Sequence, residues 1–162
     1  MKYTLAIDIG ASSGRHIIGY MENGKMVLEE IYRFPNYMDG VDGHRVWDTK
    51  RLFNEILAGL IKAKEIGKTP ETIGIDTWGV DYALLDKDDN ILRNSIIWCD
   101  NRAFDEAKQL ENDLGNDFFK KVTGNNVVPS FTLSKLLWVK NNEPEIFKKI
   151  DKKCCIILKG VI

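Results

Sequence analysis

The feature that most constrains this chain is a polar loop near its start, set between two apolar runs. The loop reads Asp8-Ile9-Gly10-Ala11-Ser12-Ser13-Gly14-Arg15, and strand-like sequence precedes it from Tyr3 and resumes at Ile17. Backbone N–H groups beside glycine approach an anion closely, and the serine hydroxyls and the arginine add further donors. Asp8, at a strand end, suits a hydrated Mg²⁺. The stretch predicts either a site for a metal-bound polyphosphate or, in the plainer alternative, an ordinary Gly/Ser-rich hairpin turn.

Two familiar kinds of phosphate loop do not fit this stretch. No Gly-Lys-Ser or Gly-Lys-Thr follows the glycines, so the loop is not of the Walker type. The run that begins at Ile17 looks like a strand and not a helix, which argues against a dinucleotide-binding fingerprint. A strand–loop–strand cradle that opens on Asp-x-Gly resembles the superfamily of actin, hexokinase and the chaperone ATPases.

Composition narrows the class of protein. The 162 residues suffice for one domain with a sizeable core, and 23 basic against 24 acidic residues give a net charge of -1. This balance gives no electrostatic reason to expect nucleic acid or a membrane surface as a partner, and the start of the chain resembles neither a signal peptide nor a membrane span. Cys99 and the adjacent pair Cys154 and Cys155 suit neither a disulfide framework nor a zinc site, so we expect a reduced, cytoplasmic protein.

The order of elements in the first half indicates the fold class. After the strand that ends at Ile9, strands are predicted over 15–21 and 25–33, joined by the two-residue turn Asn23-Gly24. A loop over 35–46 follows, then a helix capped by Asp48 or Thr49 that ends near Gly67, and a strand over 72–76. This order is that of a ribonuclease H-like α/β lobe with a mixed sheet and flanking helices.

The periodicity of the remaining sequence predicts shorter elements. Strands are expected over 80–85, 91–98 and 154–158, and helices over 103–114, over 117–122 and from Thr132 or Ser134 onward. His44, in the loop before the first helix, is given no role. The first helix has an apolar face that we expect to be buried, made of Leu52, Phe53, Ile56, Leu57, Leu60 and Ile61.

A second polar and aromatic cluster follows the strand that ends at Asp76. The sequence continues Thr77-Trp78-Gly79-Val80-Asp81, and ligands of open α/β sheets bind at the carboxyl ends of strands. A tryptophan beside a glycine offers a flat wall with open space, which suits a sugar. The alternative is a capped turn with Trp78 in the core and both aspartates bound to backbone amides, and the residues alone leave the two interpretations open.

Two further segments carry polar residues at expected element boundaries. Trp98, Asp100 and Arg102 leave a strand end, where Asp100 or Asn101 would equally cap the next helix. Ser130-Phe131 precedes the helix that carries Lys135-Leu136-Leu137-Trp138, and taken alone it reads as a loop and a helix start.

These segments, in this order, resemble the sugar kinases of the FGGY family over residues 2–157. The loop from Asp8 to Arg15 looks like that family's first phosphate loop. The blocks 73–86, Arg33-Phe34-Pro35-Asn36 and Val46-Trp47-Asp48 look specifically like the rhamnulokinases, whereas 98–102 and 129–145 look more like xylulokinases.

The resemblance implies a role for each matching position. Asp8 would act on Mg²⁺ through water, and Arg102 would hold its loop together or reach the sugar. Asp76 and Asp81 would bind sugar hydroxyls or brace the turn. The ATP phosphates would be held by Gly10, Ala11, Ser12, Ser13, Gly14 and Arg15. The sugar would be contacted by Gly79, walled by Trp78 and Trp98, and closed off by Ser130 and Phe131.

The resemblance also implies an activity: ATP-dependent phosphorylation of a ketose, with L-rhamnulose as the first candidate and D-xylulose as the second. It places the catalytic base and the C-terminal lobe beyond residue 162, and the ending Lys159-Gly160-Val161-Ile162 departs from the family pattern. Residues 1–162 are therefore expected to form an incomplete N-terminal lobe, inactive alone, that self-associates through its uncovered sheet. The alternatives are a non-catalytic sugar- or nucleotide-binding remnant and a chaperone- or actin-like ATPase.

Overall fold

The computed structural model describes residues 1–41 and 43–155. The chain divides into two compact units: unit 1 comprises Met1–Tyr37 and Asp48–Gly79, and unit 2 comprises Met38–Trp47 and Val80–Cys155. The expected strand residues 156–158 and the divergent ending at 159–162 lie outside the described residues. Within the described ranges, no helix is long and apolar enough to cross a membrane.

Unit 1 is built on a four-stranded mixed sheet with the strand order β3-β2-β1-β6. Strands β1 (Thr4–Ile9), β2 (Ser13–Glu22) and β3 (Lys25–Pro35) run antiparallel, and β6 (Thr72–Thr77) pairs parallel with β1. The hairpin turn at Asn23 and Gly24 is confirmed, because both residues take positive φ angles, 49° and 77°. The mixed sheet confirms the expected α/β class.

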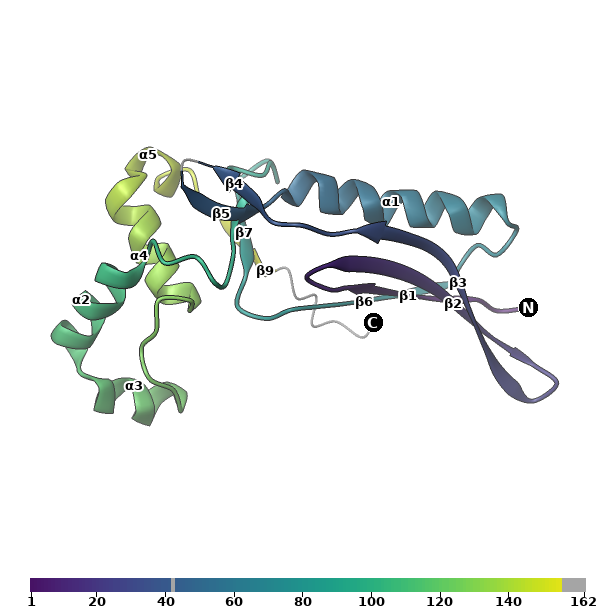
Figure 1. Cartoon of the computed structure of the whole chain (residues 1–162), viewed down its shortest axis with the longest axis horizontal. Coiled ribbons are helices and arrows are strands. Elements are labelled where there is room, and N and C mark those ends of the chain that lie inside the picture. The colour runs from purple at the N-terminus through teal and green to yellow at the C-terminus, as the bar shows by residue number, and fades with distance from the viewer. Residues whose placement is uncertain (42, 156–162) are drawn as a thin grey trace. The chain divides into compact units, whose positions relative to one another are not determined.

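Helix α1 (Thr49–Glu65) lies along one face of this sheet (Figure 1). It begins as expected, because the Asp48 carboxylate accepts a hydrogen bond of 2.9 Å from the amide of Arg51. It also ends as expected: Gly67 takes a φ of 72°, a left-handed conformation that closes the helix. Each end of this helix is therefore set by a single residue.

The buried face of α1 differs from the expected one. Its buried residues are Leu52, Gly59 and Ala63, whereas Phe53, Leu57 and Ile61 are exposed. The reason is His16 of β2, whose ring carbon and nitrogen atoms lie 2.1–2.4 Å from where a Cβ on Gly59 would sit. The imidazole fills the space beside Gly59. The helix therefore packs its Gly59 face against the sheet, and the face that carries Phe53, Leu57 and Ile61 is exposed. The expected self-association through an uncovered sheet stays a prediction.

Unit 2 contains the remaining elements. A three-stranded sheet has the order β4-β5-β8, from Asp39–Val41, His44–Trp47 and Ser95–Ile96, and β7 (Tyr82–Leu85) pairs with β9 (Lys152–Cys155). Its core includes Tyr82, Leu84, Ile96 and Val139. Its helices are α2 (Phe104–Leu114), α3 (Asn116–Thr123), α4 (Thr132–Asn142) and α5 (Pro144–Phe147).

Three expectations for unit 2 need correction. The expected loop over 35–46 contains the β4–β5 hairpin, whose strands are too short to show an alternating pattern. The strand expected from Val80 begins only at Tyr82, because Val80 has a φ of 63° and cannot continue a strand. The strand expected over 91–98 shrinks to Ser95–Ile96, with Ile91 forming an isolated bridge to Leu85.

Candidate functional site

The polar loop near the start of the chain is a tight turn between β1 and β2. The amide of Gly10 donates to the carbonyl of Ser13 at 2.9 Å, which closes the turn. Asn36, at the end of β3, clamps it from the side: its amide donates to the Ser12 carbonyl at 2.9 Å and its Nδ2 to the Gly10 carbonyl at 2.8 Å. The tip, Ala11 and Ser12, is exposed. A shaped loop with an accessible tip is suited to binding an anion.

Asn36 is itself held in place by Arg51 of α1. Arg51 donates through Nη2 to Asn36 Oδ1 at 2.7 Å and through Nη1 to the Pro35 carbonyl at 3.2 Å. The backbone amide of Tyr37 also donates to Asn36 Oδ1, at 3.1 Å. Asn36 is buried, so the three hydrogen bonds of its side chain fix the amide in one orientation. Sequence reasoning gave neither residue a role. The only signal was the rhamnulokinase-like stretch that ends at Asn36.

Both glycines of the loop, Gly10 and Gly14, have close neighbours that leave little room for a side chain. A Cβ on Gly14 would lie 2.1 Å from the ring of Phe34, and one on Gly10 would lie 3.1 Å from the Ser13 carbonyl. Neither glycine has a positive φ. Gly14 therefore leaves the space that the far end of the Phe34 ring occupies, and a larger residue at this position would collide with that ring.

Asp8 and Arg15 face each other across the β1–β2 pair at the base of the loop. Arg15 donates through Nε at 2.9 Å and through Nη2 at 2.8 Å, both to Asp8 Oδ2. Within the described part of the chain Oδ1 has no hydrogen-bond donor, so it is available to a metal-bound water. The parallel register sets Asp76 of β6 directly beside Asp8, which adds a second, exposed carboxylate.

This donor set fits a weakly held Mg²⁺. No group of three or more His, Cys, Asp or Glu side chains that could hold a metal occurs among the described residues. Mg²⁺ in phosphate sites is commonly bound by one or two carboxylates, with waters and substrate phosphates completing its shell. Asp8 with Asp76 beside it matches that pattern.

A sequence model of the FGGY family of carbohydrate kinases, N-terminal domain, matches residues 3–160. The chain belongs to this family. Among curated relatives, the rhamnulokinase of Ligilactobacillus salivarius is 39% identical over 94% of this chain and 31% of its own length, and that of Bacillus subtilis is 41% identical over 94% and 30%. The chain thus spans about a third of the length of the curated relatives it matches.

Solved structures agree with the family assignment. A xylulose kinase from Lactobacillus acidophilus superposes with a TM-score of 0.79 at 25% identity, covering 94% of this chain and 31% of that protein. A xylulose kinase from Rhodospirillum rubrum superposes with a TM-score of 0.80 at 24% identity, covering 95% and 32%. The second likeness shows the fold alone.

The residues that the FGGY resemblance assigns to the sugar fall in both units, each described by itself. Trp78 and Gly79 belong to unit 1, directly after β6, with the tryptophan half-buried and the glycine exposed. In unit 2, Trp98 is 47% exposed in the turn after β8. The other assigned positions of unit 2 are Asp81, Arg102, Ser130 and Phe131.

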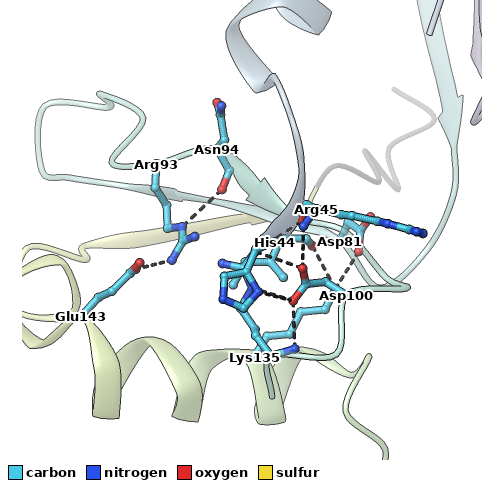
Figure 2. A network of polar contacts seen from close by, with 10 residues as sticks. His44, Arg45, Asp81, Arg93, Asn94, Asp100, Lys135 and Glu143 are labelled. Carbon is cyan, nitrogen blue, oxygen red and sulfur yellow. Dashed lines mark hydrogen bonds and ion pairs between the residues drawn. The ribbon is translucent and has the colours of Figure 1, made fainter. Parts of the chain in front are cut away.

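Asp81 is buried in a polar network that Figure 2 shows in close-up. Its Oδ2 accepts from Trp47 Nε1 at 2.7 Å and its Oδ1 from Lys135 Nζ at 2.7 Å. At 2% exposure the carboxylate is out of reach of a sugar, so the geometry favours the bracing alternative. Burial lowers the pKa of Lys135, against the opposing hydrogen bond and charge of Asp81.

Arg102 binds its own loop. Its Nε donates to Asp100 Oδ1 at 2.7 Å and its amide to the same oxygen at 2.9 Å, while the Arg45 amide donates to Oδ2 at 2.7 Å. Burial alone would raise the pKa of Asp100, but these donors outweigh it and lower the pKa to about 2. His44, given no role from sequence, lies 3.6 Å from Asp100 through Nδ1. Arg102 therefore holds the loop together, which was one of its two expected roles.

The ring of Trp138, on α4, makes contacts that were not predicted from the sequence. The guanidinium carbons of Arg93 and Arg102 lie 5.6 and 5.0 Å from its ring centroid, and His44 meets it edge-on at 6.0 Å. Arg93 is in turn paired with Glu143 (Figure 2). The two arginines join the loops on either side of β8 to α4 by cation–π contacts, and the His44 ring contact joins β5 to the same helix.

Ser130 and Phe131 lie in the turn that leads into α4, which the Phe131 amide closes by donating to the Val128 carbonyl at 3.2 Å. Phe131 lines a mainly apolar cavity of about 360 Å³ together with Val80 and residues of α2 and α3. Trp98 and Ser130 are not among the described residues that line it. Within unit 2, the structure therefore does not bring the assigned sugar residues into one cavity.

Proposed function

We propose that this chain is the front part of a rhamnulokinase-type sugar kinase, whose whole protein transfers the γ-phosphoryl group of ATP to L-rhamnulose. Identity of 39–41% to rhamnulokinases over 94% of the chain carries this proposal. D-Xylulose is the second candidate, since solved xylulose kinases share the fold. Residues 1–162 would form part of the N-terminal lobe of such an enzyme.

The loop between β1 and β2 would bind the ATP phosphates. Ser12 and Ser13 would donate hydroxyl hydrogen bonds, and Arg15 would share its guanidinium between Asp8 and a phosphate oxygen. Asp8 would hold Mg²⁺ through a water on Oδ1, with Asp76 as its neighbour. A bound Mg²⁺ would neutralise charge on the phosphates. The backbone of Gly10, Ala11 and Gly14 would complete the cradle.

The accessible residues that we propose for sugar binding are Trp78 and Gly79 in unit 1 and Trp98, Ser130 and Phe131 in unit 2. Gly79 would contact the ketose, and its lack of a side chain would leave space for it. Asp81 and Arg102 are committed to protein partners at 2.7 Å, which supports a scaffold role for both.

The test is a titration of the 162-residue chain with L-rhamnulose and with D-xylulose, followed by tryptophan fluorescence and by ADP release with Mg·ATP. We expect tighter binding of L-rhamnulose, and we expect Gly79→His to reverse or abolish that preference by filling the space. Gly40→His is the matched control, because a Cβ at Gly40 would meet no atom within 4 Å. An unchanged sugar preference in Gly79→His would remove Gly79 from the site.

The same titration tests the expectation that residues 1–162 are inactive alone. Sugar-dependent fluorescence without ADP release is the expected result, and ADP release would show that the chain turns over by itself. Absence of any sugar response at millimolar concentration would contradict the proposed sugar binding.

A further inference from the structure

The buried ammonium of Lys135 is the most constrained charge in unit 2. Lys135 is fully buried on α4, and its Nζ donates to Asp81 Oδ1 at 2.7 Å, to the Ile96 carbonyl at 3.0 Å and to the Val80 carbonyl at 3.4 Å. A lysine ammonium has three N–H donors, and each of these has an acceptor. The group is therefore satisfied, and its position is fixed by two separate segments, the adjacent residues Val80 and Asp81 and the strand residue Ile96.

Stability alone is a poor reason for this arrangement. Burying an ion pair requires desolvation of both charges, and apolar side chains of similar volume often serve a core equally well. The Asp81 carboxylate is further tied to the Trp47 indole at 2.7 Å. What the pair supplies, and an apolar pair would not, is directed hydrogen bonds to particular backbone and side-chain atoms.

One of those atoms belongs to a strained residue. Val80 has a φ of 63°, a left-handed conformation that is an outlier for a β-branched side chain. Such a conformation persists only where the surroundings over-determine it. Lys135 binds both the carbonyl of Val80 and the carboxylate of the next residue, Asp81. Lys135 thus holds the strained φ torsion of Val80 through hydrogen bonds to Val80 itself and to Asp81, the next residue.

The φ torsion of Val80 has a direct consequence for Gly79. Rotation about this bond sets where the carbonyl carbon of Gly79 lies relative to the carbonyl carbon of Val80, because the intervening peptide bond is planar. A right-handed φ at Val80 would turn the Gly79 carbonyl to a different side of the chain. Gly79 is the residue proposed to contact the sugar.

We propose that Lys135 is a positioning residue for the sugar site: its ammonium holds the left-handed backbone at Val80 through the Val80 carbonyl and Asp81, and so orients Gly79. This inference rests on the proposed function for its sugar-binding consequence. Its backbone consequence is independent of any ligand. The two are therefore tested by separate measurements on the full 162-residue chain.

The first measurement is amide hydrogen exchange over residues 79–82 in the variant Asp81→Asn/Lys135→Met. This variant removes both buried charges, while the new amide oxygen still accepts from Trp47. We expect exchange in this segment to rise at least tenfold, with exchange in α2 unchanged. Lys140→Met, at an exposed position of the same helix, is the matched control and should match the wild type. Unchanged exchange over 79–82 in the double variant overturns the proposal.

The second measurement is L-rhamnulose affinity, read from tryptophan fluorescence. We expect Kd to rise at least tenfold in Asp81→Asn/Lys135→Met and to recover at least threefold on adding Val80→Asn, because asparagine adopts the left-handed conformation readily. A purely structural role for Lys135 would show no such recovery, so its absence overturns the positioning role. If the wild type binds no sugar while exchange still rises, the proposed function fails and the backbone role of Lys135 stands.

Val80→Asn alone decides the case if the double variant does not fold. Relief of the strained valine should raise Tm by about 2–4 °C, the shift that a modest stabilisation produces in a chain of this length. A lowered or unchanged Tm would show that Val80 is not strained, and would overturn the proposal.

Discussion

Unit 1 and unit 2 each contain an aspartate paired with a basic residue, and the two pairs differ chiefly in burial. The side chains of Arg15 and Asp8 are 46% and 44% exposed, whereas those of Lys135 and Asp81 are both 0% exposed. Their closest contacts are nearly equal, 2.8 and 2.7 Å. The difference therefore lies in what surrounds each pair and not in its geometry.

The surroundings give the two pairs different uses. An exposed pair contributes little to stability, so Asp8 and Arg15 can be separated by a phosphate or a metal-bound water at small cost. A buried pair that loses one partner leaves an uncompensated charge in the core. The comparison teaches that the exposed pair is suited to exchange partners with a ligand, and the buried pair to hold a shape.

The largest expected effect is that of breaking the buried pair. Lys135→Met should lower the free energy of unfolding by about 3–5 kcal/mol, because it leaves the Asp81 carboxylate buried without its cation. Urea denaturation measures this. Adding Asp81→Asn should recover much of the loss, and Lys140→Met should cost less than about 0.5 kcal/mol. If Lys135→Met lowered the free energy of unfolding by as little as Lys140→Met, the proposed difference between the buried and the exposed pair would be wrong.

An intermediate effect is expected from acid. The pKa of Asp100 is lowered to about 2, so the folded state keeps this carboxylate ionised at a pH where the unfolded state binds a proton. Stability should therefore fall as the pH drops from about 4 to about 2, by a total of about 2 kcal/mol. Urea midpoints across this range test it. Asp100→Asn should flatten the slope, and an equally steep slope in that variant would assign the loss to other groups.

The smallest effect on stability is expected at the exposed pair. Asp8→Asn should change the free energy of unfolding by less than about 1 kcal/mol, while it lowers Mg²⁺-dependent binding of ATP at least tenfold. Asp88→Asn, which breaks the exposed pair with Lys87, is the control and should leave both quantities unchanged. Isothermal titration with and without Mg²⁺ measures the binding. A stability loss as large as that of Lys135→Met would erase the distinction between the two pairs.

Local signals in the sequence predicted much of unit 1. The Asn23-Gly24 turn, the cap at Asp48 and the stop at Gly67 each depend on a single residue whose chemistry is decisive, and the structure has all of them. The order of elements along the chain, three strands, a helix and a fourth strand, could also be predicted, whereas the order of the strands within the sheet comes from the structure. The buried face of α1 was predicted wrongly, because the space beside Gly59 is filled by His16 of β2, which lies far earlier in the chain.

Unit 2 was harder to predict because its decisive contacts join distant segments. Lys135 lies in the run Lys-Leu-Leu-Trp and looks like an ordinary solvated lysine on an amphipathic helix, and its partners Asp81 and Ile96 lie far away in sequence. The left-handed conformation of Val80 has no local signal, since valine favours strands. Arg102, by contrast, has its partner Asp100 only two residues away, so a loop-holding role could be put forward from the sequence as one of its two alternatives.

The Asn36 clamp has a consequence for the order in which the molecule forms. The loop from Gly10 to Ser13 owes its shape to a side chain 26 residues further along, which is itself oriented by Arg51. The loop cannot reach its final form from local interactions, because closing such a long stretch of chain requires β2, β3 and the start of α1 to be in place first. During synthesis the proposed phosphate loop would therefore lack its final conformation until about the first turn of α1 has left the ribosome. The loop is made early, but it would be one of the later parts of unit 1 to fold.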